Sequence, residues 1–238
     1  SIFHRPSVSP FALLPFRGSD DPVGRMFCDV HTPEGLLAPS DPRAVLERTL
    51  DRAADMGFSV MVHPEIEFYL LQKPMTPDHL VPVDNAGYFD QVARGGSNDF
   101  RRRAIRTLED MGISVEFSHH EGGPGQNEID LRAVDAVTAA DNIMTFRTVV
   151  EEVALAEDMV ATFMPKPFIE HPGSGMHTHF SLFEGEHNAF FEAAGQYQLS
   201  KTGRQFIAGV LHHAKAICAI TNQHVNSYKR LWGGGEAP

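Results

Sequence analysis

The stretch Phe58-Ser-Val-Met-Val-His-Pro-Glu-Ile-Glu-Phe-Tyr-Leu-Leu71 places two glutamates, Glu65 and Glu67, one residue apart inside an otherwise apolar run. Such a run predicts a β-strand, in which side chains two residues apart share one face, roughly 6–7 Å from each other. Ile66 and Phe68 would then line the opposite face. Two buried carboxylates side by side need a proton, a basic side chain or a metal ion. Taken alone, the segment also fits a strand with one solvated face.

The composition is that of a globular protein with an acidic balance. The chain has 238 residues, 42% of them hydrophobic, and a formal net charge of −11. It lacks the basic surface that a nucleic acid or an anionic membrane requires, and it has no apolar run of about 18 residues. Cys28 and Cys218 form neither a disulfide framework nor a thiolate metal site. We expect a soluble, cytoplasmic protein with no nucleic-acid or membrane partner, and the missing initial Met indicates a fragment.

Apolar spacing and breaker residues predict the order of helices and strands. Helices are expected over residues 41–57, 97–111, 136–158 and 203–222. Strands are expected over 11–16, 25–30, 58–71, 113–121, 126–132 and 175–183, with a short one ending near Met164. The Gly-Gly-Pro-Gly run at 122–125 joins two alternating segments and predicts a hairpin. We therefore predict an α+β fold, with an antiparallel or mixed β-sheet and helices packed on its outer face.

Two imidazoles and a hydroxyl follow a glycine-rich turn near residue 175. Strand alternation places His177, His179 and Ser181 on one face. A lone histidine is more often a satisfied core or surface residue, but three polar groups on one face favour a binding site. The preceding turn at 172–175 lets backbone N–H groups approach an anionic or amino-acid ligand closely.

The predicted hairpin adds two more acids, Glu121 at the end of its first strand and Glu128 early in its second. An ordinary polar hairpin end is the alternative interpretation of this pair. With Glu65, Glu67 and His177 they form a ligand set of mostly oxygen atoms, which suits Mg²⁺ or Mn²⁺. So many acids indicate more than one ion, which is typical of phosphoryl transfer.

The last residues, 226–238, supply positive charge and another acid. Lys229 and Arg230 could hold a carboxylate or a phosphate, which arginine binds bidentately. Glu236 follows three glycines, on a loop from which a general base could swing over a site. The alternative is a frayed chain end.

Four motifs in order give the chain a resemblance to glutamine synthetase of type I. The family's Pro-Glu-x-Glu-Phe strand is similar to residues 64–68, and its Gly-Gln-x-Glu motif to residues 125–128. Its nucleotide-site signature is similar to Lys166-Pro167 with Gly173-Ser-Gly-Met-His-Thr-His-Phe-Ser-Leu182, and its substrate-loop motif to Asn226-Ser-Tyr-Lys-Arg-Leu231. The resemblance covers nearly the whole chain.

The resemblance implies two metal sites. Glu67, Glu121 and Glu128 would bind the ion that organises glutamate and ammonium. Glu65 and His177 would bind the ion that holds the phosphates of ATP. The implied cofactor is Mg²⁺ or Mn²⁺, with ATP as a substrate.

The resemblance also implies which residues bind the substrates and act on them. Gly173 would contact glutamate through its backbone, Arg230 would hold the glutamate carboxylate and act in catalysis, and Glu236 would close the site and take a proton from ammonium. ATP would phosphorylate the γ-carboxylate, and ammonia would displace phosphate from the acyl phosphate, which divides a hard step into two easier ones. The residues facing the nucleotide would be Glu116, His179 and Ser181.

The resemblance further implies a division of the chain and some departures from the family. Residues 1–35 would be the tail of an N-terminal β-grasp domain, and 36–238 the N-terminal part of the catalytic domain of an enzyme that is a homo-oligomer at full length. Pro172 replaces the usual Asn, so it has no side-chain amide for the substrate amino group. The arginine-rich stretch that follows Glu-Ala-Pro in the family is missing, so we expect little or no turnover from these 238 residues. A γ-glutamyl ligase for a polyamine or other amine, and a non-catalytic fragment, remain alternatives.

Overall fold

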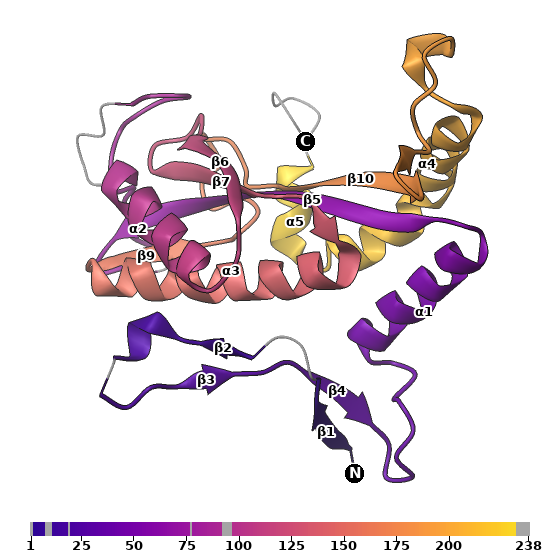
Figure 1. The fold of residues 1–238 in the computed structure, drawn as a ribbon. Helices are drawn as coiled ribbons and strands as arrows, with labels where there is room; N and C mark the ends of the chain where they lie inside the picture. Colours follow the sequence, from indigo (N-terminus) through magenta and orange to yellow (C-terminus); the bar gives the residue numbers. More distant parts are fainter. Residues whose placement is uncertain (1, 8–10, 19, 77, 92–96, 232–238) are drawn as a thin grey trace.

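The computed structural model describes residues 2–7, 11–18, 20–76, 78–91 and 97–231 (Figure 1). Its helices are α1 (Pro42–Asp55), α2 (Ser97–Asp110), α3 (Ala136–Ala156), α4 (Lys201–Thr221) and α5 (Val225–Arg230), with short 3-10 helices at Pro15–Arg17 and Gln196–Gln198. Its strands are β1 (Phe3–Pro6), β2 (Ala12–Leu13), β3 (Gly24–Arg25), β4 (Cys28–His31), β5 (Ser59–Gln72), β6 (Val115–His120), β7 (Gln126–Leu131), β8 (Val134–Asp135), β9 (Met159–Thr162), β10 (Met176–Glu184) and β11 (His187–Asn188).

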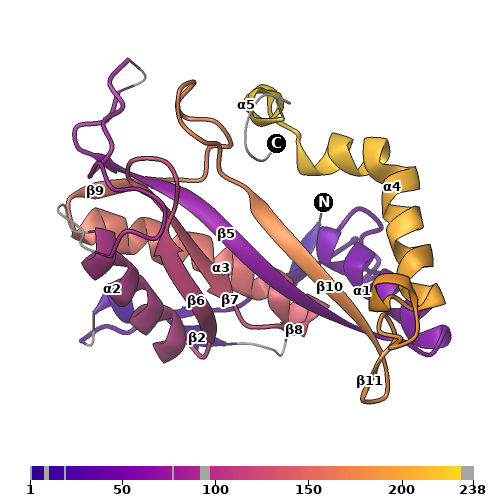
Figure 2. The same ribbon diagram turned by 90° about the horizontal axis from the view of Figure 1, so that it is seen from above.

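The long strand β5 is the centre of a seven-stranded sheet with the path β11-β10-β5-β7-β6. Every pairing in this sheet is antiparallel, which confirms the predicted fold class. One edge of β5 pairs with β10 and then β9, and the other edge pairs with β8 and then β7. Figure 2 shows β5 and β10 running side by side across the molecule.

The two faces of the sheet differ in what they contact. Helices α2 and α3 lie along one face, which is the lower face in Figure 1. Phe68 of β5 is fully buried there and its ring packs against Phe100 of α2 and Phe146 of α3. Ile66 and Leu70 join the same core. The residues between them in the sequence therefore point to the opposite face, as the alternation predicts.

Local signals explain where several elements begin and turn. The Asp41 side chain accepts a hydrogen bond from the Arg43 backbone N–H and caps α1, whose first residue is Pro42. Ser200 caps α4 in the same way by accepting from the Gly203 N–H at 3.0 Å. The hairpin predicted around 122–125 is confirmed by the β6–β7 pairing.

The N-terminal segment forms two separate two-stranded sheets, β1 with β4 and β2 with β3. The strand predicted over 11–16 is shorter than expected because Pro15 starts a 3-10 helix. Side chains tie this segment to the rest of the fold: Arg25 donates to Thr145 of α3 at 2.6 Å, and Asp29 lies 3.3 Å from Arg43 of α1.

Helix α4 leaves much of its apolar stripe accessible. Phe206 packs against Phe180 and Phe190, whereas Leu211 is 70% and Ile220 77% exposed. In the part of the chain that the structure describes, no helix has the length and apolar character that crossing a bilayer demands.

We expect Phe68→Ala to lower the free energy of unfolding by about 3–5 kcal/mol, because it opens a cavity between β5, α2 and α3. Ile169→Ala is the matched control, since Ile169 is 88% exposed, and should change stability by no more than about 0.5 kcal/mol. Urea unfolding followed by circular dichroism measures both. Equal effects of the two substitutions would contradict this description of the core.

Candidate functional site

Three neighbouring strands bring the predicted acids and imidazoles together on the face opposite α2 and α3. In the β5–β7 ladder, Glu67 is paired with Glu128 and Glu65 with Asp130. In the β5–β10 ladder, His177 is paired with Glu65. Directly paired residues have side chains on the same face, so the register itself builds a cluster of carboxylates with an imidazole at its border.

The imidazoles of β10 lie against the glutamates of β5. His179 Nε2 is 2.7 Å from Glu65 Oε1, and His177 Nδ1 is 3.5 Å from Glu65 Oε2. His177 Nδ1 is also 3.8 Å from Glu67 Oε1. The Glu65 carboxylate therefore directs its two oxygens toward two different histidines.

The hairpin contributes a second imidazole–carboxylate group around His119. His119 Nε2 lies 3.3 Å from Glu128 Oε2, and its Nδ1 lies 3.5 Å from Glu121 Oε1. The ring is buried and stacks on Phe89 at a centroid distance of 4.5 Å. This packing holds the His119 ring between the two acids.

These side chains form three overlapping groups that could hold a metal ion, with ligand atoms within 4.8 Å of one another in each group. One group joins Glu65, Glu128 and His177, and a second joins His119, Glu121 and Glu128. The third consists of His63, Glu65 and His179. The predicted metal ligands Glu65, Glu121, Glu128 and His177 thus lie together, and Glu67 lies beside them through its contact with His177.

Burial and mutual repulsion make the acids hard to ionise without a cation. Burial raises the pKa of Glu67 to about 7, although the Gly175 N–H and the Arg230 charge oppose the shift. Burial also raises the pKa of Glu128, and a hydrogen bond with Glu121 and the charge of Asp130 add to it. Burial raises the pKa of Asp130 as well. Such a set favours either bound protons or bound cations.

The glycine-rich turn packs against Arg230 of α5. A Cβ atom on Gly173 would lie 2.7 Å from Arg230 Cγ, and one on Gly175 would lie 2.7 Å from Arg230 Nη2. The backbone of the turn also meets the acids: Gly175 N–H donates to Glu67 Oε2 at 3.1 Å, and Gln126 donates to the Gly173 carbonyl at 3.0 Å. The turn thus joins the guanidinium to the acidic cluster.

Helix α5 is held in place by a pair of hydrogen bonds. Asn226 accepts from the Lys166 N–H at 2.7 Å and donates to the Lys166 carbonyl at 2.9 Å. Lys166 in turn donates from Nζ to the His171 carbonyl at 2.6 Å. Asn226 was not a predicted site residue, yet it fixes the helix that carries Arg230.

Two other predicted site residues, Ser181 and Glu116, stand apart from the acidic cluster, and a third falls outside the part of the chain that the structure describes. Ser181 is half-buried farther along β10, where it is paired with Met61. Glu116 is exposed at a bulge in β6, and among the described residues it joins none of the three ligand groups. Glu236 lies outside the described residues.

Sequence reasoning missed three members of the cluster, His63, His119 and Asp130. Each lies two residues from a glutamate that was predicted: His63 from Glu65, His119 from Glu121, and Asp130 from Glu128. The same two-residue alternation that grouped Glu65 with Glu67 would have found His63 and Asp130 on their strands.

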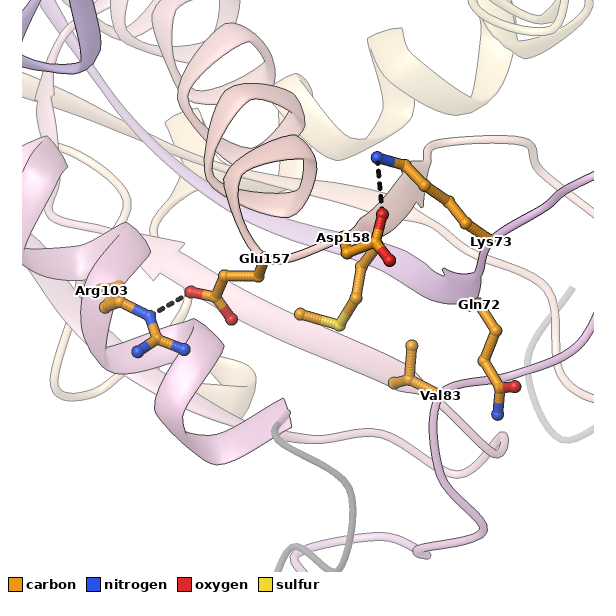
Figure 3. Close-up of a pocket in the computed structure, with 7 residues that line it drawn as sticks. Gln72, Lys73, Val83, Arg103, Glu157 and Asp158 are labelled. Carbon is orange, nitrogen blue, oxygen red and sulfur yellow. Dashed lines mark hydrogen bonds and ion pairs between the residues drawn. The ribbon is translucent and has the colours of Figure 1, made fainter.

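A separate open depression of about 490 Å³ lies where β9, α2 and the end of β5 meet (Figure 3). Its charged residues neutralise one another: Arg103 pairs with Glu157, and Lys73 Nζ lies 3.4 Å from Asp158 Oδ1. Among the predicted site residues that the structure describes, none lines it. The chemistry therefore belongs to the sheet face and not to this depression.

Comparison with known proteins gives a consistent family match. Residues 39–238 match the family described as the glutamine synthetase catalytic domain. A glutamine synthetase of Mycobacterium tuberculosis is 60% identical over 237 residues, covering 98% of this chain and 53% of that protein, and one of Thermus thermophilus is 45% identical over 241 residues. The glutamine synthetase structure of Plasmodium falciparum superposes with a TM-score of 0.90 at 27% identity, covering 99% of this chain and 51% of that one. A GmaS/ADP complex superposes with a TM-score of 0.87 at 34% identity. The chain spans about half the length of the curated relatives it matches.

We expect the metal-free chain to lose stability as the pH rises. The pKa of Glu67 is raised from 4.5 to about 7 in the fold. The contribution of its neutral form to stability is therefore full below pH 4.5, and it is lost as the pH rises from there through 7. The loss is on the order of 3 kcal/mol for this group, and Mg²⁺ should offset it at pH 8.

Thermal unfolding in EDTA and in Mg²⁺, from pH 5 to pH 8, tests this expectation. Glu67→Gln should flatten the pH dependence in EDTA, because the amide does not ionise. Glu186→Gln is the matched control, since Glu186 is exposed on the turn before β11, and it should behave like the parent chain. A parent chain that becomes more stable between pH 5 and pH 8 in EDTA would contradict the expectation.

Proposed function

The chain belongs to the glutamine synthetase catalytic-domain family, and from this premise we propose that it forms the metal-binding and ATP-binding part of a glutamate–ammonia ligase. In that reaction ATP phosphorylates the γ-carboxylate of glutamate, and ammonia displaces phosphate from the γ-glutamyl phosphate. The observation that carries the proposal is the convergence of Glu65, Glu67, Glu128 and His177 on one face of the sheet.

The residues present fit divalent cations. The donors are carboxylate oxygens with few imidazoles, which suits Mg²⁺ or Mn²⁺, and the buried Asp130 Oδ1 has no hydrogen-bond partner within the described part of the chain. In the proposal, Glu67, Glu121 and Glu128 hold one ion, and Glu65 and His177 hold the other. When bound, such ions neutralise the charge of phosphate oxygens during transfer.

The other side chains would bind and orient the substrates. Arg230 of α5 has a planar guanidinium that suits a carboxylate, and it packs against the turn whose Gly173 backbone would contact glutamate. Its charge also lowers the pKa of Glu67, against the larger effect of burial. We assign Glu236 the role of closing the site and taking a proton from ammonium. The proposed nucleotide contacts are Glu116, His179 and Ser181.

The proposal extends to the organisation of the whole enzyme. Residues 1–35 would end a β-grasp domain and residues 36–238 would begin the catalytic domain. The enzyme would be a cytoplasmic homo-oligomer. The strands β1, β2, β3 and β4 lie outside the seven-stranded sheet, which agrees with a domain boundary after them.

The test is Mg²⁺-dependent release of phosphate from ATP in the presence of glutamate and ammonium. It is carried out with the 238-residue chain and with a longer protein, here called the joined protein. In the joined protein this chain is fused to the additional segments that its relatives have. We expect turnover from the joined protein, with far less from the 238 residues. A joined protein that releases no phosphate with ammonium or with any amine would refute the ligase function. Release only with methylamine or putrescine would indicate a γ-glutamyl ligase for larger amines.

In the joined protein, Glu128→Gln and Arg230→Lys should each lower kcat/KM by about 100-fold or more, because the first removes a charged metal ligand and the second replaces a bidentate guanidinium by a single ammonium group. Arg230→Lys should raise the KM for glutamate and leave that for ATP nearly unchanged. The exposed Glu186→Gln control should keep full activity. Equal effects of Glu128→Gln and Glu186→Gln would contradict the proposed site.

A further inference from the structure

We propose that His63, Glu65 and His179 form a binding site for a divalent transition-metal ion such as Zn²⁺. His63 and His179 are directly paired in the β5–β10 ladder, and their rings stack at a centroid distance of 5.2 Å with 26° between the planes. Glu65 lies two residues from His63 on the same face, with Oε1 at 2.7 Å from His179 Nε2. One ligand atom from each of the three lies within 4.8 Å of the other two.

The donor set selects a softer ion than Mg²⁺. Two imidazole nitrogens and one carboxylate oxygen make a common three-residue set for Zn²⁺ with one open position, whereas Mg²⁺ prefers oxygen ligands. Metal–ligand bonds of about 2.0–2.2 Å in a tetrahedral site put ligand atoms roughly 3.3 Å apart. The separations here are close enough for small side-chain rotations to close the site.

Within the described chain, one buried atom of His63 and one of Asp130 lack hydrogen-bond partners. His63 Nε2 and Asp130 Oδ1 are both inaccessible and accept or donate no hydrogen bond within the described chain. Asp130 is only 7% exposed and is paired with Glu65 across the β5–β7 ladder. A buried polar atom without a partner costs free energy, and a cation bound at His63 Nε2 would remove that cost for the nitrogen.

This ion shares only Glu65 with the phosphate-side ion, and it uses a different oxygen of that carboxylate. Glu65 Oε1 faces His179, whereas Oε2 lies 3.5 Å from His177. One carboxylate can therefore serve two ions through its two oxygens. The inference stands whether or not the chain is part of a ligase, because it concerns metal binding alone.

The probe is Co²⁺, added to the 238-residue chain in excess Mg²⁺ and followed by visible absorption and titration calorimetry. We expect one Co²⁺ with the intense absorption of a four-coordinate site, displaced by Zn²⁺. His63→Gln and His179→Gln should each weaken Co²⁺ binding by about 100-fold or more and abolish that absorption. His177→Gln and the exposed control His187→Gln should retain it.

Two results would overturn the site. Co²⁺ binding that is absent, or unchanged in both His63→Gln and His179→Gln, would show that these imidazoles are not ligands. Loss of binding in His177→Gln to the same degree would show one shared site instead of two. His63 is half-buried, so its variant is checked by thermal unfolding, and the more exposed His179 variant decides the question should the first be unstable.

Discussion

Repulsion among carboxylates that share one face of the sheet is the constraint on which the rest of this structure depends. Glu65 and Glu67 on β5 face Asp130 and Glu128 on β7 at paired positions, so at neutral pH their charges oppose folding. The opposite face of the same strands supplies the compensating stability. There Ile66, Phe68 and Leu70 are buried against α2 and α3, and along β5 Ile66 and Phe68 alternate with Glu65 and Glu67.

The cluster is surrounded by groups that partly offset its charge. The Gly175 N–H approaches from the glycine-rich turn, and the guanidinium of Arg230 approaches from α5. A side chain on Gly173 or Gly175 would collide with Arg230. Imidazoles approach from β10 and from the hairpin. This partial compensation leaves room for cations, and it explains why the site lies at a sheet face and not in the depression of Figure 3, where the charges are already paired.

Much of this could be predicted from particular residues. The alternation around Glu65 and Glu67 and the His177–His179 pair predicted strands that the structure confirms, and the turn at 122–125 predicted a hairpin that it also confirms. Asp130 was predictable by the same rule, because it lies two residues after Glu128 and shares its face of the strand. The role of Asn226 could not be predicted, since it depends on the Lys166 backbone lying against α5, 60 residues away in the sequence.

The sequence by itself determined which side chains share a face, because strand alternation is a local property of the backbone. It also determined the apolar stripe that binds β5 to its helices, and through its four motifs the family. Only the tertiary structure decided which acids meet which imidazoles. Strand register pairs Glu65 with both His177 and Asp130, and no local rule contains that information. The same register sets His63 against His179, and it raises the pKa of Glu67 by burying its carboxylate among other acids.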